Sequence, residues 1–290
     1  MPVGMARRHR AERIGVEAKR VRCGREVDQV EHQPSSEART LASEAMLRAA
    51  VRQDRFLFAF QPVVCAATGS VDYFECLLRM RDEHGTLIAG VEFISIIEAL
   101  GLIGVIDHHV LEKTVEELVA HPQVSLGLNV SGLTVCNPTW LQSLIALLRH
   151  RSEIARRLVV EITETAALSD MADSARVVTI LRQIGCRVAL DDFGAGHTSL
   201  RHLEVLPLDI VKIDGSIIRN LTNSRQNLGL LRHLLGHTKD FGFATVAEWV
   251  ENEDDAELLR AEGIGYLQGY HVGRPTFERS RLATAETTVR

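Results

Sequence analysis

The sequence lacks any long hydrophobic run. None of its apolar stretches approaches the ~18 consecutive residues that a membrane-spanning helix requires, so we expect no membrane span. The N-terminal region carries basic residues without the apolar core that a signal peptide needs. Both absences favour a soluble protein inside the cell.

Cysteine is scarce, and its spacing has no pattern. The five cysteines are odd in number, are scattered along the chain and include no CxxC pair. Small disulfide-stabilised proteins carry even sets of cysteines, and thiols stay reduced inside the cell. The sequence therefore predicts a reduced, cytoplasmic protein rather than a disulfide framework.

An excess of positive charge is also missing. Lysine and arginine number 33 against 38 aspartates and glutamates, which gives a formal net charge of -5. Proteins that coat duplex nucleic acid need the opposite balance, because they neutralise phosphates. We therefore expect no duplex nucleic acid as a partner, and an anionic ligand would need metal ions or a few well-placed cations beside it.

The chain alternates β-rich runs with helical patterns. Its 290 residues, 46% of them hydrophobic, are enough for one large core, and roughly 250 residues is usual for an α/β barrel. Strands are predicted at 56–64, 71–78, 125–130, 158–162, 187–190, 210–213, 244–247 and 266–267. Helices are predicted at 42–52, 91–100, 106–120, 138–151, 171–184, 199–206, 226–241 and 254–261.

This order of elements predicts an α/β fold, a TIM-like (β/α)8 barrel with an antiparallel first strand. The tight turn at Thr68 and Gly69 makes the first two strands antiparallel. The later strands alternate with helices, which favours parallel pairing. A doubly wound open sheet is the alternative, but it binds ligands at a switch point and would not gather residues from nearly every strand.

The barrel is expected over residues 41–280, with a tail at 281–290. Residues 1–40 mix arginines with glutamates, carry few large apolar groups and end in a linker-like Gln-Pro-Ser-Ser sequence. This lead is predicted to be flexible or a solvated helix, and an arm that binds a second copy or another protein is the alternative.

Polar side chains, most of them carboxylates, stand where the predicted strands end. They are Glu75, Asn129, Glu161, Asp191, Asp192, Lys212, Glu248 and Gln268. In a parallel barrel these ends converge on one rim, and buried carboxylates are costly unless cations or donors meet them. Oxygen ligands of this kind suit Mg²⁺ or Mn²⁺ rather than zinc. An aspartate that bridges two ions roughly 3.5–4 Å apart would give a site for phosphodiester hydrolysis.

Two local patterns refine this site. Adjacent residues of a straight strand point apart, so Asp191 and Asp192 share a site only if the chain bends there, and Gly194 and Gly196 make a bend easy. On the second strand, period-two alternation places Arg79 on the same face as Glu75. The sequence therefore predicts a cation for a phosphate oxygen beside the carboxylates.

Several motifs together resemble a known family, the EAL domain. They are Glu75-Cys76-Leu77, Asn129, Glu161-Ile162-Thr163-Glu164, Asp191-Asp192-Phe193-Gly194-Ala195-Gly196, Lys212-Ile213-Asp214, Ala247-Glu248-Trp249-Val250-Glu251 and Gln268-Gly269-Tyr270. The resemblance covers about residues 45–275 in the family's order. It implies a bacterial phosphodiesterase that hydrolyses one bond of cyclic di-GMP to linear pGpG with Mg²⁺ or Mn²⁺.

The resemblance also implies residue roles. The metal ligands would be Glu75, Asn129, Glu161, Asp191, Asp192 and Glu248. Lys212 matches the essential lysine and, with Glu248, Glu251 and Gln268, makes up the catalytic set. The substrate-binding set is Gln61, Arg79 and Asp192. Apart from the resemblance, Glu251 and Glu164 are candidates to orient Lys212 or a ligand, with plain salt bridges as the alternative. Residues 192–199 match a loop that couples metal binding to dimer contacts, which implies a homodimer, and a regulatory protein partner is a further expectation.

The departures from the family pattern are few. Trp249 stands where glycine is common, and it either crowds the site or provides a stacking surface. Cys76 replaces alanine on the far face of its strand, and Ala195 and His197 change the loop. Two rival functions follow: a receptor that binds cyclic di-GMP without effective turnover and acts through a protein partner, and an unrelated metal-dependent barrel enzyme acting on a small carboxylate.

Overall fold

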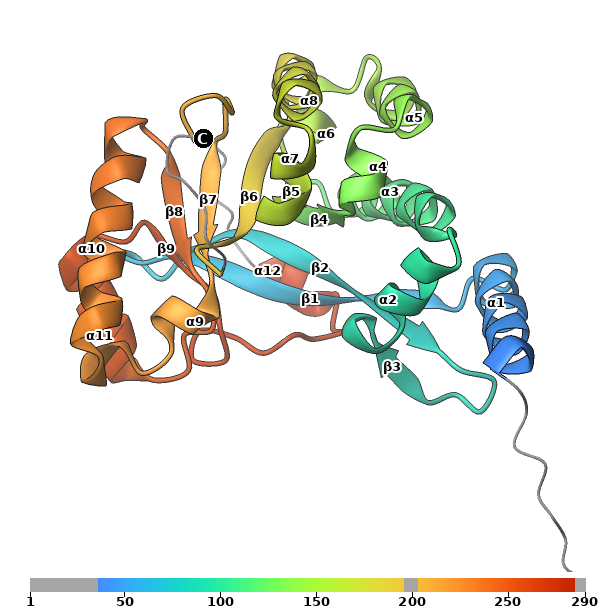
Figure 1. The fold of residues 1–290 in the computed structure, drawn as a ribbon, viewed down its shortest axis with the longest axis horizontal. Helices are drawn as coiled ribbons and strands as arrows, with labels where there is room; N and C mark the ends of the chain where they lie inside the picture. Colours follow the sequence, from blue (N-terminus) through green and yellow to red (C-terminus); the bar gives the residue numbers. More distant parts are fainter. Residues whose placement is uncertain (1–35, 196–202, 285–290) are drawn as a thin grey trace, which may run out of the picture.

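The described strands form one sheet that closes on itself. The computed structural model describes residues 36–195 and 203–284 (Figure 1). The strands are β1 (Phe56–Cys65), β2 (Val71–Arg81), β3 (Leu87–Ala89), β4 (Leu126–Val130), β5 (Leu158–Thr163), β6 (Arg187–Phe193), β7 (Ile210–Ile213), β8 (Ala244–Ala247) and β9 (Tyr266–Leu267). Their order is β1-β9-β8-β7-β6-β5-β4-β2-β3, and an additional β1–β2 pairing closes the barrel, with β3 at the margin of β2.

Strand direction confirms the predicted fold. β1 pairs antiparallel with both β2 and β9, whereas β2 and β4 to β9 are parallel to one another. The link between β1 and β2 is tight because Gly69 adopts a positive φ of 71° and the Cys65 N–H donates to the Ser70 carbonyl oxygen at 2.8 Å. The antiparallel first strand thus follows directly from the short turn.

Helices cover the outside of the barrel (Figure 1). They are α1 (Ser36–Arg52), α2 (Gly90–Ala99), α3 (Ile103–Ala120), α4 (Gly132–Val135), α5 (Pro138–Leu148), α6 (Ser152–Ala155), α7 (Glu164–Ser169), α8 (Met171–Ile184), α9 (Gly215–Ile218), α10 (Arg225–Asp240), α11 (Glu253–Glu262) and α12 (Ser280–Thr284), with a 3₁₀ turn η2 (Leu221–Asn223). Within the described ranges, no helix is both long and apolar enough to cross a bilayer.

A small apolar cluster fills the inside of the barrel. It consists of Val63, Tyr73, Val159, Ala189, Ile210 and Val246, all nearly inaccessible to solvent. Five of these stand two residues before Glu75, Glu161, Asp191, Lys212 and Glu248. Side chains two residues apart on a strand share a face, so the polar residue that follows each of these apolar residues also points into the barrel, one layer closer to its mouth.

The structure differs from the predicted elements in a few places. The helix predicted at 138–151 is wrong as a single element, because α5 ends at Leu148 and His150 takes a positive φ of 63° before α6. β3 was not predicted, and β6 runs beyond residue 190. The helix predicted at 199–206 lies largely outside the described residues, and its described end, 203–206, is a turn.

Candidate active site

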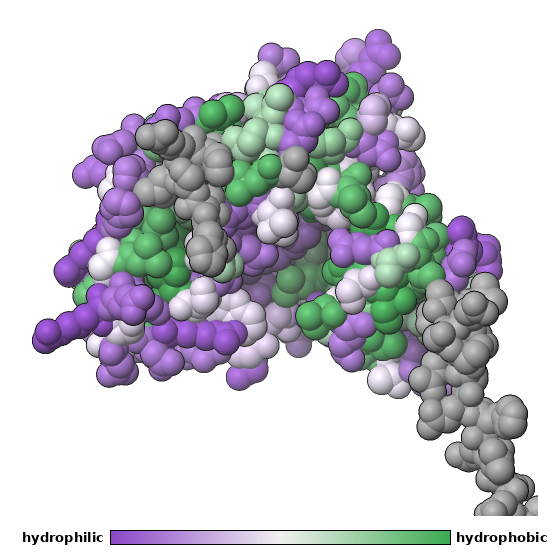
Figure 2. All heavy atoms as spheres, in the orientation of Figure 1, coloured by the Kyte–Doolittle hydropathy of each residue, from purple (hydrophilic) through white to green (hydrophobic). Residues whose placement is uncertain are grey.

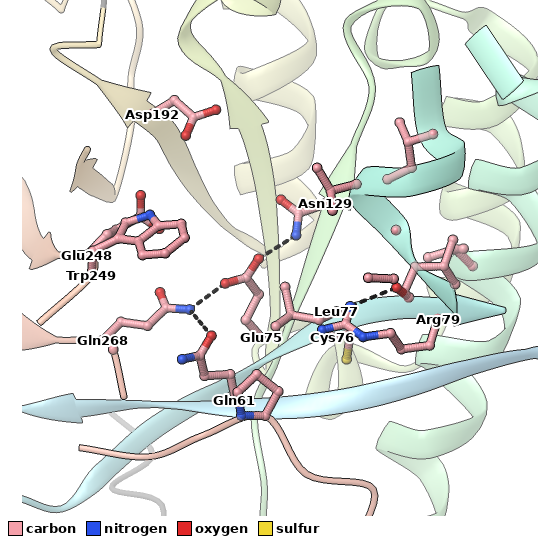
Figure 3. Close-up of a pocket in the computed structure, with 18 of the residues that line it drawn as sticks. Gln61, Glu75, Cys76, Leu77, Arg79, Asn129, Asp192, Glu248, Trp249 and Gln268 are labelled. Carbon is pink, nitrogen blue, oxygen red and sulfur yellow. Dashed lines mark hydrogen bonds between the residues drawn. The ribbon is translucent and has the colours of Figure 1, made fainter. Parts of the chain in front are cut away.

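The predicted polar residues lie at the mouth of the barrel, at the carboxyl ends of the parallel strands. Figure 3 labels Glu75, Asn129, Asp192, Glu248 and Gln268 among them. β2 supplies Glu75, β4 Asn129, β5 Glu161, β6 Asp191 and Asp192, and β7 Lys212, while Glu248 and Gln268 follow β8 and β9 directly. Gln61 on the antiparallel β1 lies opposite Glu75 in register. The closed sheet therefore brings these residues, distant in sequence, around one point.

Lys212 is the centre of this cluster. Its side chain has no solvent exposure, and its Nζ lies 2.6 Å from Glu161 Oε2, 2.9 Å from Glu248 Oε1, 3.0 Å from Asp191 Oδ1 and 3.4 Å from Glu75 Oε2. A buried ammonium is stable only when anions and acceptors surround it. Four carboxylates, three on strands β2, β5 and β6 and one directly after β8, provide that surrounding.

Glu75 is held from several sides. Asn129 Nδ2 donates to Glu75 Oε1 at 2.6 Å, and Gln268 Nε2 donates to Glu75 Oε2. Gln268 in turn approaches Gln61 Oε1 at 3.4 Å, and Gln61 Nε2 donates to the Gly273 carbonyl oxygen at 3.2 Å (Figure 3). These contacts fix the carboxylate orientation across β1, β2, β4 and β9.

The two adjacent aspartates reach one site because the backbone bends at Asp192. Its φ is 56°, and the pairing of β6 with β7 skips from Leu190 to Phe193. Gly194, with φ 93°, continues the bend, and its N–H donates to Glu164 Oε2 at 3.1 Å. The bend that the sequence required is therefore present, and a buried glutamate from α7 stabilises the turn after it.

Carboxylate oxygens converge into two groups around this bend. One group combines Glu75, Glu161 and Asp191, and the other combines Asp191, Asp192 and Glu248, with ligand atoms within 4.8 Å of one another in each group. Asp191 belongs to both. An aspartate shared by two oxygen clusters is the arrangement that a two-metal site requires.

A cavity of about 550 Å³ opens over the cluster. Figure 2 shows the hollow in the middle of one face, with hydrophilic residues in its depth and hydrophobic residues toward α2 and α3. Its apolar wall includes Val91, Ile94, Ile103 and Val110. A cavity of this size, polar at the base and apolar at one side, suits a small organic ligand with charged groups.

The comparison with known families decides what kind of domain this is. A sequence model described as the EAL domain matches residues 44–275. The chain belongs to the EAL domain family. This confirms the resemblance noted from the motifs at the strand ends.

Individual relatives give the same result. The EAL chain is 32% identical over 233 residues to the cyclic di-GMP phosphodiesterase PdeF of Escherichia coli, covering 79% of this chain and 31% of that protein. It is similar to the structure of the PaMucR phosphodiesterase in complex with c-di-GMP, with a TM-score of 0.75, 28% identity and coverage of 81% of this chain and 97% of that one. For the FimX EAL domain from Pseudomonas aeruginosa bound to c-di-GMP the TM-score is 0.76, with 26% identity and coverage of 81% and 97%. The chain spans about 30% of the length of the first curated relatives that it matches.

The acids of the EAL site outnumber the cation among them. Burial, followed by the nearby charges of Glu75 and Asp191, raises the pKa of Glu161 to about 8, although Lys212 opposes the shift. Burial and then Asp191 raise the pKa of Asp192 to about 6 and that of Glu248 well above its ordinary value. Ionising all of these carboxylates at once would place more negative charge in the site than Lys212 alone compensates, and the raised pKa values follow from that imbalance and from burial.

Lys212 and Glu75 differ from these acids, because nearby charges and hydrogen bonds outweigh burial in setting their pKa values. Burial by itself lowers the pKa of Lys212, but Asp191, Glu161, Glu248 and Glu75 outweigh it and keep the ammonium protonated well above its usual range. For Glu75, burial raises the pKa, yet Lys212 and the amide donors prevail and the pKa is lowered. Lys212 is thus a permanent hydrogen-bond donor, and Glu75 stays ionised.

The residues present fit divalent metal ions. Buried Glu161 Oε1 and Gln268 Oε1 have no hydrogen-bond partner in the described part of the chain. The candidate ligands are carboxylate and amide oxygens, without cysteine or histidine among them, which suits hard cations such as Mg²⁺ and Mn²⁺. Room for Glu161 comes from Gly127, where an added side chain would collide with Glu161 Oε1 and with the Tyr73 ring.

The raised carboxyl pKa values predict how stability depends on pH in the presence of a chelator. Glu161, with an ordinary pKa of 4.5 and a folded pKa of about 8, contributes stability that is present below about pH 4.5 and lost as the pH rises through about 8. Glu248 acts in the same direction, whereas the shift of Asp192 contributes little to stability because this side chain is exposed and screened by solvent, and the lowered pKa of Glu75 affects only more acidic conditions. At about 1.4 kcal/mol per pKa unit, we expect a loss of a few kcal/mol between roughly pH 5 and pH 9.

Urea unfolding across this range measures the loss directly. The midpoint should fall as the pH rises in chelator, and it should fall less with Mn²⁺, because a bound cation keeps the carboxylates ionised at low cost. A urea midpoint that rises between about pH 5 and pH 9 in chelator would contradict the raised pKa values of these carboxyl groups.

Arg79 and Glu251 lie away from Lys212. Arg79 lines the cavity on the side of α2, with its Nη1 donating to the Leu78 carbonyl oxygen at 2.9 Å (Figure 3). Glu251 is exposed at the cavity edge and is not among the carboxylates paired with Lys212 in the described part of the chain. A catalytic role for Glu251 stays a prediction.

The sequence reasoning did not identify Asp107 on α3. Asp107 lines the cavity, is buried, and accepts a hydrogen bond from the Ser131 N–H at 3.2 Å. Burial raises its pKa to about 6. In the sequence, Asp107 is marked as an acidic residue on an otherwise apolar helix face, beside Ile103, Ile106 and Val110.

Proposed function

We propose that this EAL domain hydrolyses one phosphodiester bond of cyclic di-GMP to linear pGpG with Mg²⁺ or Mn²⁺. The observation that supports the proposal most is the group of carboxylates around buried Lys212, with Asp191 shared between two oxygen clusters. The names of the relatives point to the same substrate.

The residues divide into roles according to their position. Glu75, Asn129, Glu161, Asp191, Asp192 and Glu248 would hold the metal ions. Bound divalent cations lower the pKa of a water molecule and stabilise charge on the leaving oxygen. Lys212 keeps its proton, so it acts as a hydrogen-bond donor to developing negative charge rather than as a base. Gln268, beside Glu75 and Gln61, is placed to orient a water or the ligand.

Arg79 would bind a phosphate oxygen of the substrate. Replacing Arg79 with alanine should raise KM roughly 10- to 100-fold with little change in kcat, the loss expected for one charge-assisted hydrogen bond made equally in ground and transition states. Steady-state kinetics of pGpG formation measures both constants. The exposed Arg176 on α8 provides the control, and its alanine variant should match the wild type. A fall in kcat alone would assign Arg79 to the transition state instead.

A turnover assay tests the proposed function. The purified chain is incubated with cyclic di-GMP in Mn²⁺, in Mg²⁺ and in chelator, and pGpG is followed by chromatography. Product with metal and none in chelator supports the proposal. Tight binding without product would favour the receptor, and no binding at all would favour an unrelated barrel enzyme.

The other expectations about partners and location stay predictions. The homodimer rests on the resemblance of residues 192–199, part of which lies outside the described residues, and light scattering of the purified chain tests it. The regulatory protein partner, the cytoplasmic location and the domain limits at 40 and 280 likewise await experiments on the whole protein.

A further inference from the structure

Trp249 adopts a backbone conformation that a bulky residue normally avoids. Its φ is 55°, in the left-handed region that favours glycine. The backbone is fixed on both sides, because the Glu248 N–H donates to the Ile213 carbonyl oxygen at 3.1 Å and the Val250 N–H donates to the Gln268 carbonyl oxygen at 3.0 Å. Such strain persists where the surroundings impose it, and it is concentrated at functional sites.

Two neighbours hold the indole ring in place. Gly215, at the start of α9, leaves the space that the ring occupies, since a side chain there would collide with Trp249 Cγ and Cδ1. The Arg219 guanidinium lies over the ring, with its Cζ 3.9 Å from the ring centroid. Within the described ranges Arg219 forms no ion pair, so its charge is directed at the ring rather than at a carboxylate.

The rest of the ring faces the cavity. Trp249 is 47% exposed and lines the cavity together with Asp192, Glu248 and Gln268. Figure 3 shows Trp249 and Arg79 on opposite sides of Glu75. A residue that served only for packing would be buried, whereas Trp249 is both supported by Arg219 and accessible from the cavity beside the site carboxylates.

We propose that Trp249, supported by Arg219, stacks against one guanine base of cyclic di-GMP and so determines how tightly the substrate binds. The identity of the base rests on the proposed function. An aromatic ring offers a flat surface to any nucleobase, and a guanidinium on its other face strengthens the stack electrostatically. Trp249 touches the base and not the scissile bond, so it acts on affinity rather than on the chemical step.

Kinetics and binding of the full chain test this role. Trp249→Ala should weaken binding, seen as a rise in KM or Kd of roughly 5- to 150-fold, while Trp249→Phe, which keeps a ring, should lose much less. Arg219→Ala should show a smaller loss than Trp249→Ala. The matched control is Phe241→Ala, an aromatic residue of similar exposure (38%) outside this cavity, and its affinity should equal that of the wild type.

Intrinsic fluorescence gives a second measurement that does not depend on a weakened variant. The chain has two tryptophans, and the other, Trp140 on α5, is only 2% exposed. In a Trp140→Phe background, addition of cyclic di-GMP in chelator should quench the Trp249 emission as the base stacks on the ring. Calorimetry on the same samples reports binding independently of any tryptophan.

The outcomes separate this inference from the proposed function. If the wild type makes no pGpG but binds cyclic di-GMP by calorimetry, Kd replaces KM and the role of Trp249 is still tested. Binding by calorimetry without quenching, or unchanged affinity in Trp249→Ala, would overturn the stacking role alone. Faster turnover with unchanged KM in Trp249→Gly would show that the ring crowds the site. Absence of any binding would overturn both proposals.

Discussion

Asp191→Asn is expected to abolish the metal-dependent formation of pGpG while leaving the barrel folded. Asp191 is the residue common to both oxygen clusters, so its loss affects every metal position that the site offers. The amide keeps the shape of the side chain but removes the negative charge that attracts a divalent cation. We expect turnover to fall ~10³-fold or more, equivalent to about 4 kcal/mol in the barrier.

Calorimetric titration with Mn²⁺ and chromatography of the product measure the two effects of this variant. Both metal affinity and turnover should fall together, and the unfolding transition should remain cooperative. Asp240→Asn, which changes an exposed carboxylate on α10, is the matched control and should behave like the wild type. Normal Mn²⁺ affinity in Asp191→Asn would show that the bridging position is misassigned.

Lys212→Met should destabilise the protein in chelator and depress its turnover while sparing the binding of cyclic di-GMP. The change leaves Glu161, Glu248, Asp191 and Glu75 without the ammonium that lies between them. Removing one partner of a buried ion pair typically costs about 3–5 kcal/mol, because the remaining charge has no compensation. Methionine has a similar length, so the loss reports charge rather than volume.

Divalent metal should restore part of the lost stability in Lys212→Met, since a ligand that binds the folded state stabilises it by mass action. Turnover should not recover, because the hydrogen-bond donor is gone. Urea unfolding in chelator and in Mn²⁺, combined with the turnover assay, separates these effects. Lys239→Met changes an exposed lysine on α10 and serves as the control. A Lys212→Met variant as active as the wild type would remove Lys212 from the mechanism.

The residues of the site could be predicted from the sequence pattern at the ends of the strands. Tyr73, Val159, Ala189, Ile210 and Val246 are apolar, and the residue two positions after each is charged. In any β-strand, residues two positions apart point to the same face, so this pattern can be recognised from the sequence alone. It placed the carboxylates and Lys212 at one rim as soon as the strands were taken as parallel and closed.

Other features depended on contacts between segments far apart in the chain. The helical pattern of residues 138–151 continues through His150, yet the positive φ of His150 interrupts the helix. The apolar cavity wall from α2 and α3, with Asp107 in it, exists because α2 packs beside β2 while α3 packs beside β4 and α2. A periodic pattern reports which face of an element is buried, and it does not report against which partner.

The sequence by itself determined the barrel, its antiparallel first strand and the oxygen-rich composition of the rim, because these follow from strand periodicity, a short turn and the order of elements. Tertiary structure alone decided that Lys212 lies among four carboxylates, that the chain bends at Asp192, and that Arg219 covers the Trp249 ring. Those arrangements depend on contacts between strands far apart in the sequence and on the backbone dihedral of a single residue. Local sequence patterns specify neither of these.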